Sequence, residues 1–386
     1  MKFRPDDTPL VFAGNPMLLE CTNYDMGLEV CPYSVFIDQE PVYNGKVSID
    51  NGQIVTVDIS DVVSDVIPPY PALSGDGWLK PVCAGAAFSA YRVDAKPPGQ
   101  LAMSADVIPG RLSKQNLRVG RPVPVILTGS PFLTTRTSGW TVYLPEDELM
   151  PLYFVWDEVH ETAIELVECL HGGSLTGQWS GRGVYALDVA AARREFFENF
   201  YILPSMFELR IGDRAAAVVI ITEGTPKESK YKLGIRFLNS FEVPEMICLS
   251  GNISSSPAFG GGDDGETDRF MRWDSEVSDF ESMRNRASMA VTVSIDTDPI
   301  SSDRMTSLLD MLGAPSVELV GLGPDVVKAI PEAEDLNISL NGNAPQSFTL
   351  SFKVCAGEMA VMPAISADDT GLPDRLFSDE FNDKFN

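Results

Sequence analysis

The two histidines, His160 and His171, offer the most versatile acid–base chemistry in this chain of 386 residues. An imidazole changes charge near neutral pH, so one histidine can serve as a general acid or base. The segment WDEVHETAIE places Glu161 and Glu165 beside His160, but the second histidine of an HExxH zinc site is missing. His171 lies in HGGSLTG, whose glycines predict a loop. We therefore expect both histidines to be structural or solvated and no zinc site.

An acidic run between glycines is the best candidate for binding a cation. Asp263, Asp264, Glu266 and Asp268 supply the hard oxygens that Ca²⁺ prefers. The spacing lacks the alternating ligands and distal Glu of an EF-hand, and a solvated loop accounts for the run equally well. We expect no bound metal, and leave open whether residues 263–268 hold a cation.

Motifs for nucleophilic catalysis and phosphate binding are missing from the sequence. The segment GSLTG at 173–177 has the wrong order for a GxSxG elbow, and the glycines at 260–262 precede acids rather than a helix. We expect no catalytic residue and no cofactor, which agrees with a protein that is not an enzyme. A pair of carboxylates for glycoside hydrolysis depends on tertiary geometry, so that alternative stays open.

Aromatic side chains suggest contacts with partners. The five tryptophans are spread along the chain and most should lie in cores, although exposed aromatics on a β-sandwich could bind sugar. At the C-terminus, Phe377, Phe381 and Phe385 recur every four residues, which makes one stripe on a helix. Such a peptide either docks on another subunit or folds back on its own domain.

Charge and composition narrow the partners and the location. Lys plus Arg is 29 and Asp plus Glu is 55, so the net charge is 29 − 55 = −26, which disfavours nucleic acid and anionic membranes. No apolar run is long enough for a transmembrane helix, and the charged start MKFRPDDTPLVF does not resemble a signal peptide. Six cysteines without a CxxC pair fit free thiols made in a reducing cytoplasm.

The elements that would position these residues are mostly strands. Val55, Val57 and Ile59 alternate, and the Asn-Gly of Asp50–Gln53 predicts a tight hairpin before them. A helix is expected at Ala190–Phe197, and a second one follows Ser301 and Ser302, with Met305, Leu308, Leu309 and Leu312 on one face. The chain is long enough for several domains.

Further strands are expected in the last third of the chain. Val291, Val293 and Ile295 alternate, and two more strands are expected at Leu336–Leu340 and at Phe348–Val354. In the last of these Phe348, Leu350, Phe352 and Val354 share a face.

We predict a mainly β, multidomain fold: two β-sandwich-like domains, a smaller α+β domain and a C-terminal tail. The expected sections are an N-terminal sandwich (1–93), a Pro/Gly-rich connector (94–130), a second β domain (131–255), the α+β domain (256–364) and the tail (365–386).

Four short phrases stand out in the first two thirds of the chain: GNPM (Gly14–Met17), VDISD (Val57–Asp61), PFLTTRTSG (Pro131–Gly139) and IRFLNSFEVPE (Ile235–Glu245). They resemble phrases in structural proteins, of tail or baseplate type, from phages and prophages of Bacteroidetes. In that family, Pro usually follows "FLTTR" in the third phrase, and the fourth phrase has Gly at the position of Glu242 in this chain. The replacement of Gly suggests a corner that needs no positive φ, or a different turn.

The resemblance implies a virion component that binds other virion proteins and copies of itself, within a homo-oligomer, and that is made in the host cytoplasm. Phe377, Phe381 and Phe385 would then contact a neighbouring subunit. Two alternatives remain: a receptor- or carbohydrate-binding module at a tail tip, and a tail-associated glycan-cleaving enzyme.

Overall fold

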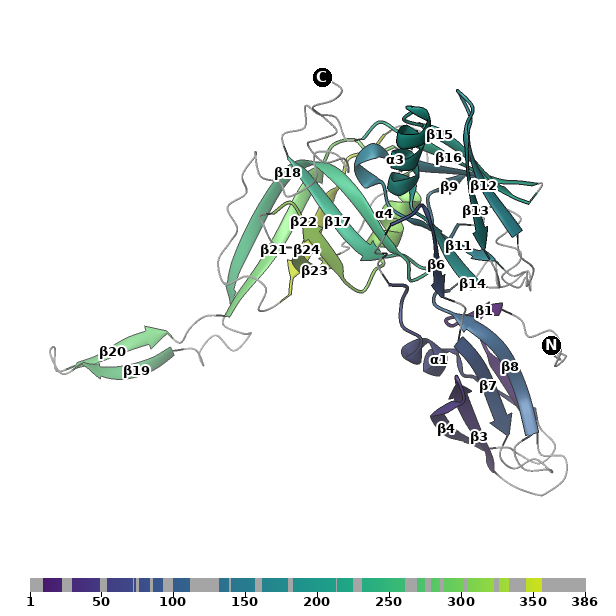
Figure 1. Cartoon of the computed structure of the whole chain (residues 1–386). Helices are drawn as coiled ribbons and strands as arrows, with labels where there is room; N and C mark the ends of the chain where they lie inside the picture. The colour runs from purple at the N-terminus through teal and green to yellow at the C-terminus, as the bar shows by residue number, and fades with distance from the viewer. Residues whose placement is uncertain are drawn as a thin grey trace. The chain divides into compact units, whose positions relative to one another are not determined.

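The computed structural model describes residues 10–22, 30–48, 54–71, 73, 76–83, 86–92, 100–111, 132–138, 140–156, 162–179, 183–212, 214–224, 231–260, 269–274, 279–284, 288–301, 304–322, 326–332 and 345–355. Strands dominate these ranges, which confirms a mainly β protein (Figure 1). The chain divides into two compact units. The first comprises Met1–Glu223 with Leu238–Glu245, and the second comprises Gly224–Phe237 with Met246–Asn386.

The first unit begins with a five-stranded sheet. Its order is β1 (Leu10–Phe12), β8 (Gln100–Ile108), β7 (Ala86–Arg92), β3 (Val30–Ile37) and β4 (Glu40–Ser48). A two-stranded sheet of β2 (Leu18–Thr22) and β5 (Ile54–Asp58) and the helix α1 (Ser60–Val66) contribute to the same core. Along β3, Cys31, Tyr33, Val35 and Ile37 are buried at alternate positions, as expected for a sheet with one covered face.

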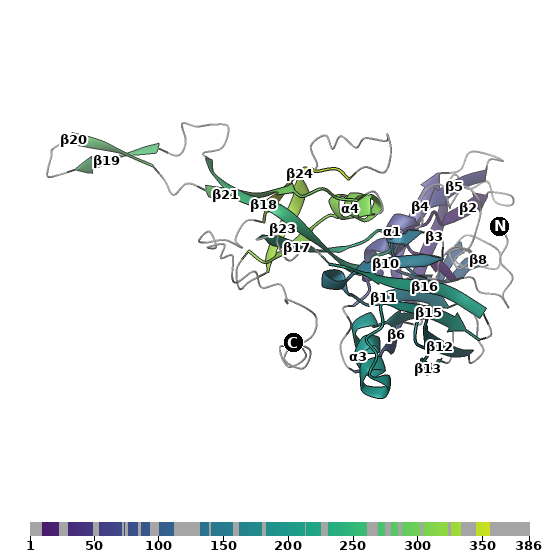
Figure 2. The ribbon, with the colours of Figure 1, turned by 90° about the horizontal axis from the view of Figure 1, so that it is seen from above.

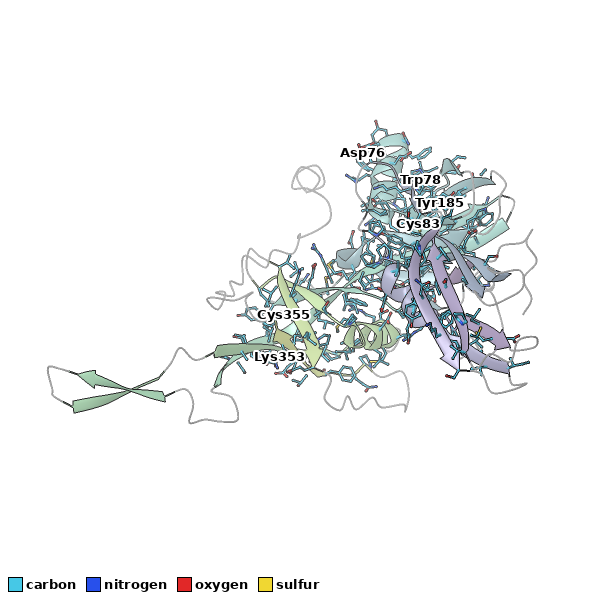
Figure 3. All side chains as sticks on the ribbon, turned by 90° about the horizontal axis from the view of Figure 1, so that it is seen from below. Asp76, Trp78, Cys83, Tyr185, Lys353 and Cys355 are labelled. Carbon is cyan, nitrogen blue, oxygen red and sulfur yellow. The ribbon has the colours of Figure 1, made fainter. Side chains whose placement is uncertain are left out.

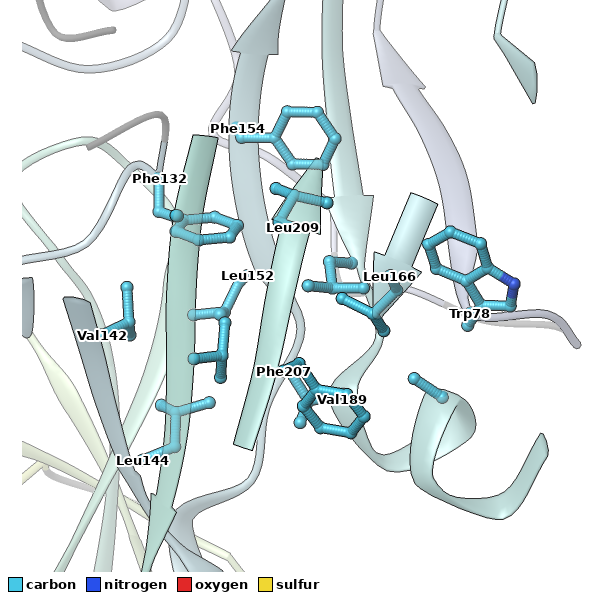
Figure 4. Packing of buried hydrophobic residues seen from close by; sticks show 14 of the residues in the cluster. Trp78, Phe132, Val142, Leu144, Leu152, Phe154, Leu166, Val189, Phe207 and Leu209 are labelled. Atoms are coloured by element: carbon cyan, nitrogen blue, oxygen red, sulfur yellow. The ribbon is translucent and has the colours of Figure 1, made fainter. Parts of the chain in front are cut away.

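Two further sheets enclose the largest core of the first unit. One has the order β13 (Ser174–Trp179), β12 (Thr162–Glu168), β15 (Met206–Ile211), β16 (Arg214–Thr222), β10 (Thr141–Pro145) and β9 (Thr137–Ser138). The other is β11 (Leu152–Trp156), β14 (Gly183–Leu187) and β6 (Leu79–Cys83). Phe132, Phe154, Leu166, Phe207 and Leu209 pack together in this core (Figure 4).

The predicted helix in this region is confirmed and is longer than expected. Helix α3 spans Val189–Phe200 and starts at Asp188, whose carboxylate accepts a hydrogen bond from the Ala191 amide at 3.0 Å. This is the usual cap of a helix N-terminus. Ala192 and Phe196 bury one face of the helix in the core, which fixes its orientation against the sheets.

The second unit is a closed barrel. Its order is β17 (Lys232–Leu238), β18 (Pro244–Gly260), β21 (Ser288–Thr297), β24 (Thr349–Val354), β23 (Val327–Glu332) and β22 (Val317–Val320). Strands β18 and β21 run side by side as the longest ladder (Figure 2). The amide of Cys355 donates to the Lys328 carbonyl at 3.0 Å. Figure 3 labels Cys355 beside Lys353, near the end of β24. A separate hairpin joins β19 (Arg269–Asp274) to β20 (Asp279–Arg284).

Helix α4 (Met305–Leu312) follows the predicted pattern only in part. Leu308 and Met311 are buried in the barrel core, but Leu309 is 47% exposed, so the buried stripe runs through Met311 instead. No side chain caps the helix start, which is at Arg304, and the helix ends before Gly313 as expected. None of the helices in the described ranges has the length and apolar run that crossing a bilayer requires.

The predicted hairpin at Asp50–Gln53 is wrong. These residues lie outside the described ranges, but the strands on either side of them, β4 and β5, belong to different sheets. The tight hairpin joins β3 to β4 instead, at Asp38 and Gln39, whose φ values are +48° and +69°. A two-residue turn with both φ values positive matches the right-handed twist of the strands, so backbone geometry overrides the weak turn preference of Gln.

The compact units cut across the sections expected from the sequence. Strand β8 lies in the expected connector but joins the N-terminal sheet, and β6 lies in the first section but pairs with β14. Strands β17 and β18 fall mainly within 131–255, yet they are barrel strands with β21 to β24. The expected strand at Leu336–Leu340 and the tail 365–386 lie outside the described ranges.

Candidate functional site

Most residues singled out for chemistry fall where the structure is not described. His160, the acidic run at 263–268, and Phe377, Phe381 and Phe385 all lie outside the described ranges. His171 is described and its side chain is 64% exposed. Within the described ranges, no three His, Cys, Asp or Glu side chains gather in a way that could hold a metal ion.

His171 belongs to a turn built around a buried carboxylate, that of Glu168. One oxygen of Glu168 accepts hydrogen bonds from the amides of Leu170, His171 and Gly172, and the His171 ring lies 3.5 Å from the other oxygen. Burial alone would raise the pKa of Glu168, but the three amide bonds outweigh it and the pKa is lowered. The carboxylate therefore holds the turn between β12 and β13.

Among the described residues, the most concentrated group of buried charge is one that the sequence analysis did not single out. We call Arg136, Glu148, Asn239 and Glu245 the Arg136 cluster. The Arg136 guanidinium contacts the Glu148 carboxylate through one nitrogen and lies 3.4 Å from Glu245 Oε2 through Nε. The side-chain amide nitrogen of Asn239 donates to Glu245 Oε1 at 2.8 Å and to the Leu133 carbonyl at 2.9 Å. Three separate segments of the first unit are thus joined by charged and amide groups.

The electrostatics of the Arg136 cluster are those of a structural ion group. Its members are between 0% and 7% exposed. Burial disfavours the charged guanidinium, but Glu148 and Glu245 more than compensate, and the pKa of Arg136 is raised. Solvent is excluded from both carboxylates, whereas a catalytic pair must face an accessible cleft. The two carboxylates are therefore better suited to a structural ion pair than to catalysis.

Asn239 and Glu245 lie in the segment Leu238–Glu245, which we call the corner. The side-chain oxygen Oδ1 of Asn239 accepts hydrogen bonds from the backbone amides of Phe241 and Val243, at 2.9 and 3.0 Å. The backbone amide of Asn239 donates to the Val243 carbonyl at 3.0 Å. Glu242 has a φ of +60°. The suggestion that this position needs no positive φ is therefore wrong. The hydrogen bonds of the corner hold the backbone at position 242 in the left-handed region, although the residue there is Glu and not Gly.

The corner is held by neighbouring segments of the first unit. The Arg111 amide donates to the Ser240 carbonyl and the Tyr70 amide to the Glu242 carbonyl, both at 3.1 Å. Gly110 approaches so closely that a Cβ built there would lie 2.6 Å from the Phe241 carbonyl oxygen. The Phe12 and Phe241 rings lie 6.0 Å apart. Only a residue without a side chain fits at position 110.

The two remaining phrases also form joints. In GNPM, the Gly14 amide donates to the Gly110 carbonyl at 3.0 Å, which ties the end of β1 to the end of β8. In VDISD, Asp58 Oδ1 accepts from the amides of Met17 and Ser60, at 3.1 and 3.0 Å. The side chain of Asp58 thereby links β2 to the start of α1.

Comparisons with known proteins add little. No protein-family model matches the chain, and no curated protein matches it. One solved structure is described as "Structural insight into host cell surface retention of a 1.5-MDa bacterial ice-binding adhesin". It is 12% identical to this chain, with a TM-score of 0.14 over 90% of this chain and 93% of that one. A likeness at this level supports no argument about fold or function.

Tryptophan placement bears on the sugar-binding alternative. Trp78 is buried and Trp156 packs against the largest core, whereas Trp140 is 50% exposed and precedes β10. Tyr143, on β10, is 36% exposed. The tryptophans are thus not confined to cores, and that alternative keeps one concrete candidate contact.

Proposed function

We propose that this protein is a non-enzymatic structural component of a phage virion, of tail or baseplate type, that works by subunit–subunit assembly. The observation that supports the proposal is the place in the fold of the four phrases that resemble such proteins. Each contributes to a buried or hydrogen-bonded joint between segments of the first unit, and two of them meet in the Arg136 cluster. Residues that hold segments of a scaffold together fit a protein that works by assembly better than one that acts on a substrate.

The proposal includes a virion location, a chain of linked β modules, and partners that are other virion proteins and copies of the chain itself. The test is mass spectrometry and immunogold labelling of particles purified from a host strain that carries the gene. We expect the chain at a fixed copy number and label at the tail. Its absence from purified particles, with the protein present in the lysate, would refute the proposal.

The stripe Phe377, Phe381 and Phe385 has its own role in the proposal, as a contact to a neighbouring subunit. Deleting residues after Ala367 should leave the circular dichroism spectrum and melting temperature unchanged and abolish assembly with partner subunits in light scattering. Unchanged assembly would remove the stripe from the proposal. Replacing the three Phe by Ser in the full chain is the matched control for a general effect of shortening.

A receptor- or carbohydrate-binding module at a tail tip is the second candidate, favoured by the exposed ring of Trp140. Exposed aromatic rings can stack on the apolar faces of sugars. A glycan array with the wild-type chain and Trp140→Ala tests it. Binding that Trp140→Ala abolishes would favour this candidate, and no signal from the wild type would count against it.

A further inference from the structure

Four large apolar side chains lie exposed at the C-terminal end of helix α3. They are Leu170 in the turn between β12 and β13, Phe200 in the last turn of the helix, and Tyr201 and Leu203 just after it. We call these four residues the α3 patch, and they are between 40% and 84% exposed. Every residue within eight positions of them along the chain belongs to the described ranges, so the segments that carry the patch are defined throughout.

Contacts within the first unit bring the segments of the patch together. A Cβ built on Gly173 would lie 3.5 Å from the Phe200 ring, so the turn between β12 and β13 packs against the end of the helix. The Cys169 amide donates to the Met206 carbonyl at 3.2 Å, which ties the same turn to the start of β15. The patch is therefore formed by three neighbouring segments of one unit.

Tyr201 reaches solvent from a strained backbone. Its φ is +57° and its ψ +30°, in the left-handed region where helices usually end with Gly. Its amide donates to the Phe197 carbonyl at 2.9 Å, and the two rings lie 6.1 Å apart. With 84% of its surface exposed, Tyr201 recovers little of this strain by burial. Strain of this kind is concentrated at sites that bind ligands or partners.

The surroundings of the α3 patch are negative. Glu195 and Glu198 are neighbours on the helix surface, and no ion pair joins either one to a described residue. Burial and the like charge of Glu198 raise the pKa of the Glu195 carboxyl. The C-terminal carbonyls of α3 form the negative end of the helix dipole, and its last turn contains no basic residue. A cation beside the patch would gain from the two carboxylates and from the dipole.

We propose that the α3 patch binds a cationic, amphipathic segment of another protein. Apolar side chains of that segment cover the four exposed residues, and its Lys or Arg side chains lie near Glu195, Glu198 and the last carbonyls of the helix. Large apolar side chains grouped at one exposed place are typical of protein-binding surfaces, and a polar rim sets which partner they accept.

Charge favours this occupant over others. A second copy of the chain carries the same net charge of −26, and an anionic membrane would be repelled as well. The tail 365–386 contains two basic and six acidic residues, so its net charge is 2 − 6 = −4 and the rim would repel it too. A cationic segment is attracted both by the rim and by the whole chain. The inference goes beyond the virion proposal, since it concerns a surface of the isolated chain.

The first test measures binding of two labelled peptides to the full-length chain by fluorescence anisotropy, at roughly 150 mM salt to screen long-range attraction. One probe is an amphipathic helical peptide of Leu and Lys, and the other has Glu in place of every Lys. We expect saturable binding of the Leu/Lys probe alone. Failure of this probe to bind, or equally tight binding of the Leu/Glu probe, would overturn the proposal.

Two double variants show whether the Leu/Lys probe binds at the α3 patch. Tyr201→Gly with Leu170→Ser should weaken its binding about tenfold or more, and Gly suits the left-handed backbone at position 201. Ile54→Ser with Ile330→Ser is the matched control, since it removes exposed apolar residues of β5 and β23. The control should bind as the wild type does. Equal binding by both variants would overturn the proposal.

A pair of charge variants separates the rim from general attraction to an acidic chain. Glu198→Lys and Glu40→Lys change the net charge equally, and both replace exposed residues, the second one on β4. Glu198→Lys should weaken binding of the Leu/Lys probe several-fold, whereas Glu40→Lys should have little effect. Equal effects of the two variants would overturn the proposal.

Other occupants have their own signatures. A wild-type dimer in light scattering that Tyr201→Gly with Leu170→Ser converts to a monomer would assign the patch to a second copy. Tighter binding of the Leu/Lys probe after deletion of the residues beyond Ala367 would assign it to the tail, and binding to anionic vesicles that the same double variant abolishes would assign it to a membrane. Each of these results would overturn the proposal. Absence of the chain from virions would leave a measured peptide site standing.

Discussion

Arg136 is the side chain whose loss should destabilise the fold most, because it neutralises two carboxylates that solvent cannot reach. Arg136→Met keeps much of the volume and removes the guanidinium that pairs with the buried carboxylates of Glu148 and Glu245. We expect the free energy of unfolding in urea to fall by about 3–5 kcal/mol. Arg210→Met is the matched control, since Arg210 pairs with Glu208 at the surface and its loss should barely move the midpoint.

A second variant distinguishes lost charge balance from lost packing. Adding Glu148→Leu and Glu245→Met to Arg136→Met removes the uncompensated charges and should recover part of the stability, as apolar replacement of buried ion groups often does. If Arg136→Met unfolds at the same urea concentration as Arg210→Met, the cluster does not carry the role assigned to it.

Glu242 holds a conformation that suits Gly better. At a φ of +60° a side chain crowds the backbone, and burial raises the pKa of the Glu242 carboxyl while Arg111 acts in the opposite direction. Glu242→Gly should raise the free energy of unfolding by about 0.5–1 kcal/mol, the strain relieved minus the added freedom of the unfolded chain. Glu242→Ala removes the carboxyl but keeps the strain, so the difference between the two variants isolates φ. Equal midpoints for both would contradict this explanation.

At the residue scale, sequence reasoning found the segment that matters but not its partners. A corner within Ile235–Glu245 was expected, whereas the contacts of Arg136 with Glu245, across 109 positions of sequence, and with Glu148, across 12, were not. Nothing in the local pattern around Glu148 marks it as buried. The sign of φ at Glu242 was also missed, because Glu is an uncommon occupant of that conformation.

At the element scale, the end of β8 and the corner fit only because Gly110 has no side chain. Gly110 and Gly77 both have positive φ, +101° and +94°, but a Cβ on Gly110 would meet the Phe241 backbone whereas one on Gly77 would meet nothing within 4 Å. Gly77→Ala should therefore cost only the backbone strain, about 1–2 kcal/mol. Gly110→Ala should cost about 2–5 kcal/mol, since forced displacement of the corner adds to the strain. Denaturant unfolding measures both, and equal losses would show that the corner moves aside freely.

The turn between β12 and β13 should make stability depend on pH. The pKa of Glu168 is lowered on folding, so the unfolded chain binds a proton more readily than the folded one. The stabilisation is complete above the unfolded value of 4.5 and is lost as the pH falls through the lower folded pKa. Unfolding free energies measured from pH 7 to pH 3 should fall more steeply for the wild type than for Glu168→Gln. Parallel profiles would contradict the role given to this carboxylate.

Elements with strong local periodicity could be predicted, and elements defined by distant pairing could not. The alternation of Val291, Val293 and Ile295, and of Phe348, Leu350 and Phe352, gave two strands whose alternate residues are buried as expected. Closure of the barrel depends on β17 pairing with β22, about 80 positions later, as in Ile235↔Leu319. A single sequence carries no local signal of such a pair. The prediction of an Asn-Gly hairpin was wrong for the same reason, because β4 pairs with β3 and β5 pairs with β2, and the turn sequence does not determine these partners.

At the scale of the whole molecule, the first unit is completed by a segment that follows it in the chain. The corner, Leu238–Glu245, belongs to the first unit although Gly224–Phe237 separates it from the rest. A chain that stops at Glu223 lacks Asn239 and Glu245 and leaves the Leu133 carbonyl without the Asn239 amide. Unit 1 should therefore fold fully only when the corner is supplied.

Two variant chains test this dependence on the corner. The first ends at Glu223, and the second joins Glu223 to Leu238–Glu245 through a flexible Gly/Ser linker as long as Gly224–Phe237. We expect the second to be more stable in urea by about 2–5 kcal/mol, from the restored bonds of a buried polar group and the partly buried ring of Phe241. Introducing Arg136→Met into the second chain should remove most of that gain, whereas Arg210→Met should leave it intact. Equal stability of the two chains would mean that the first unit is complete without the corner.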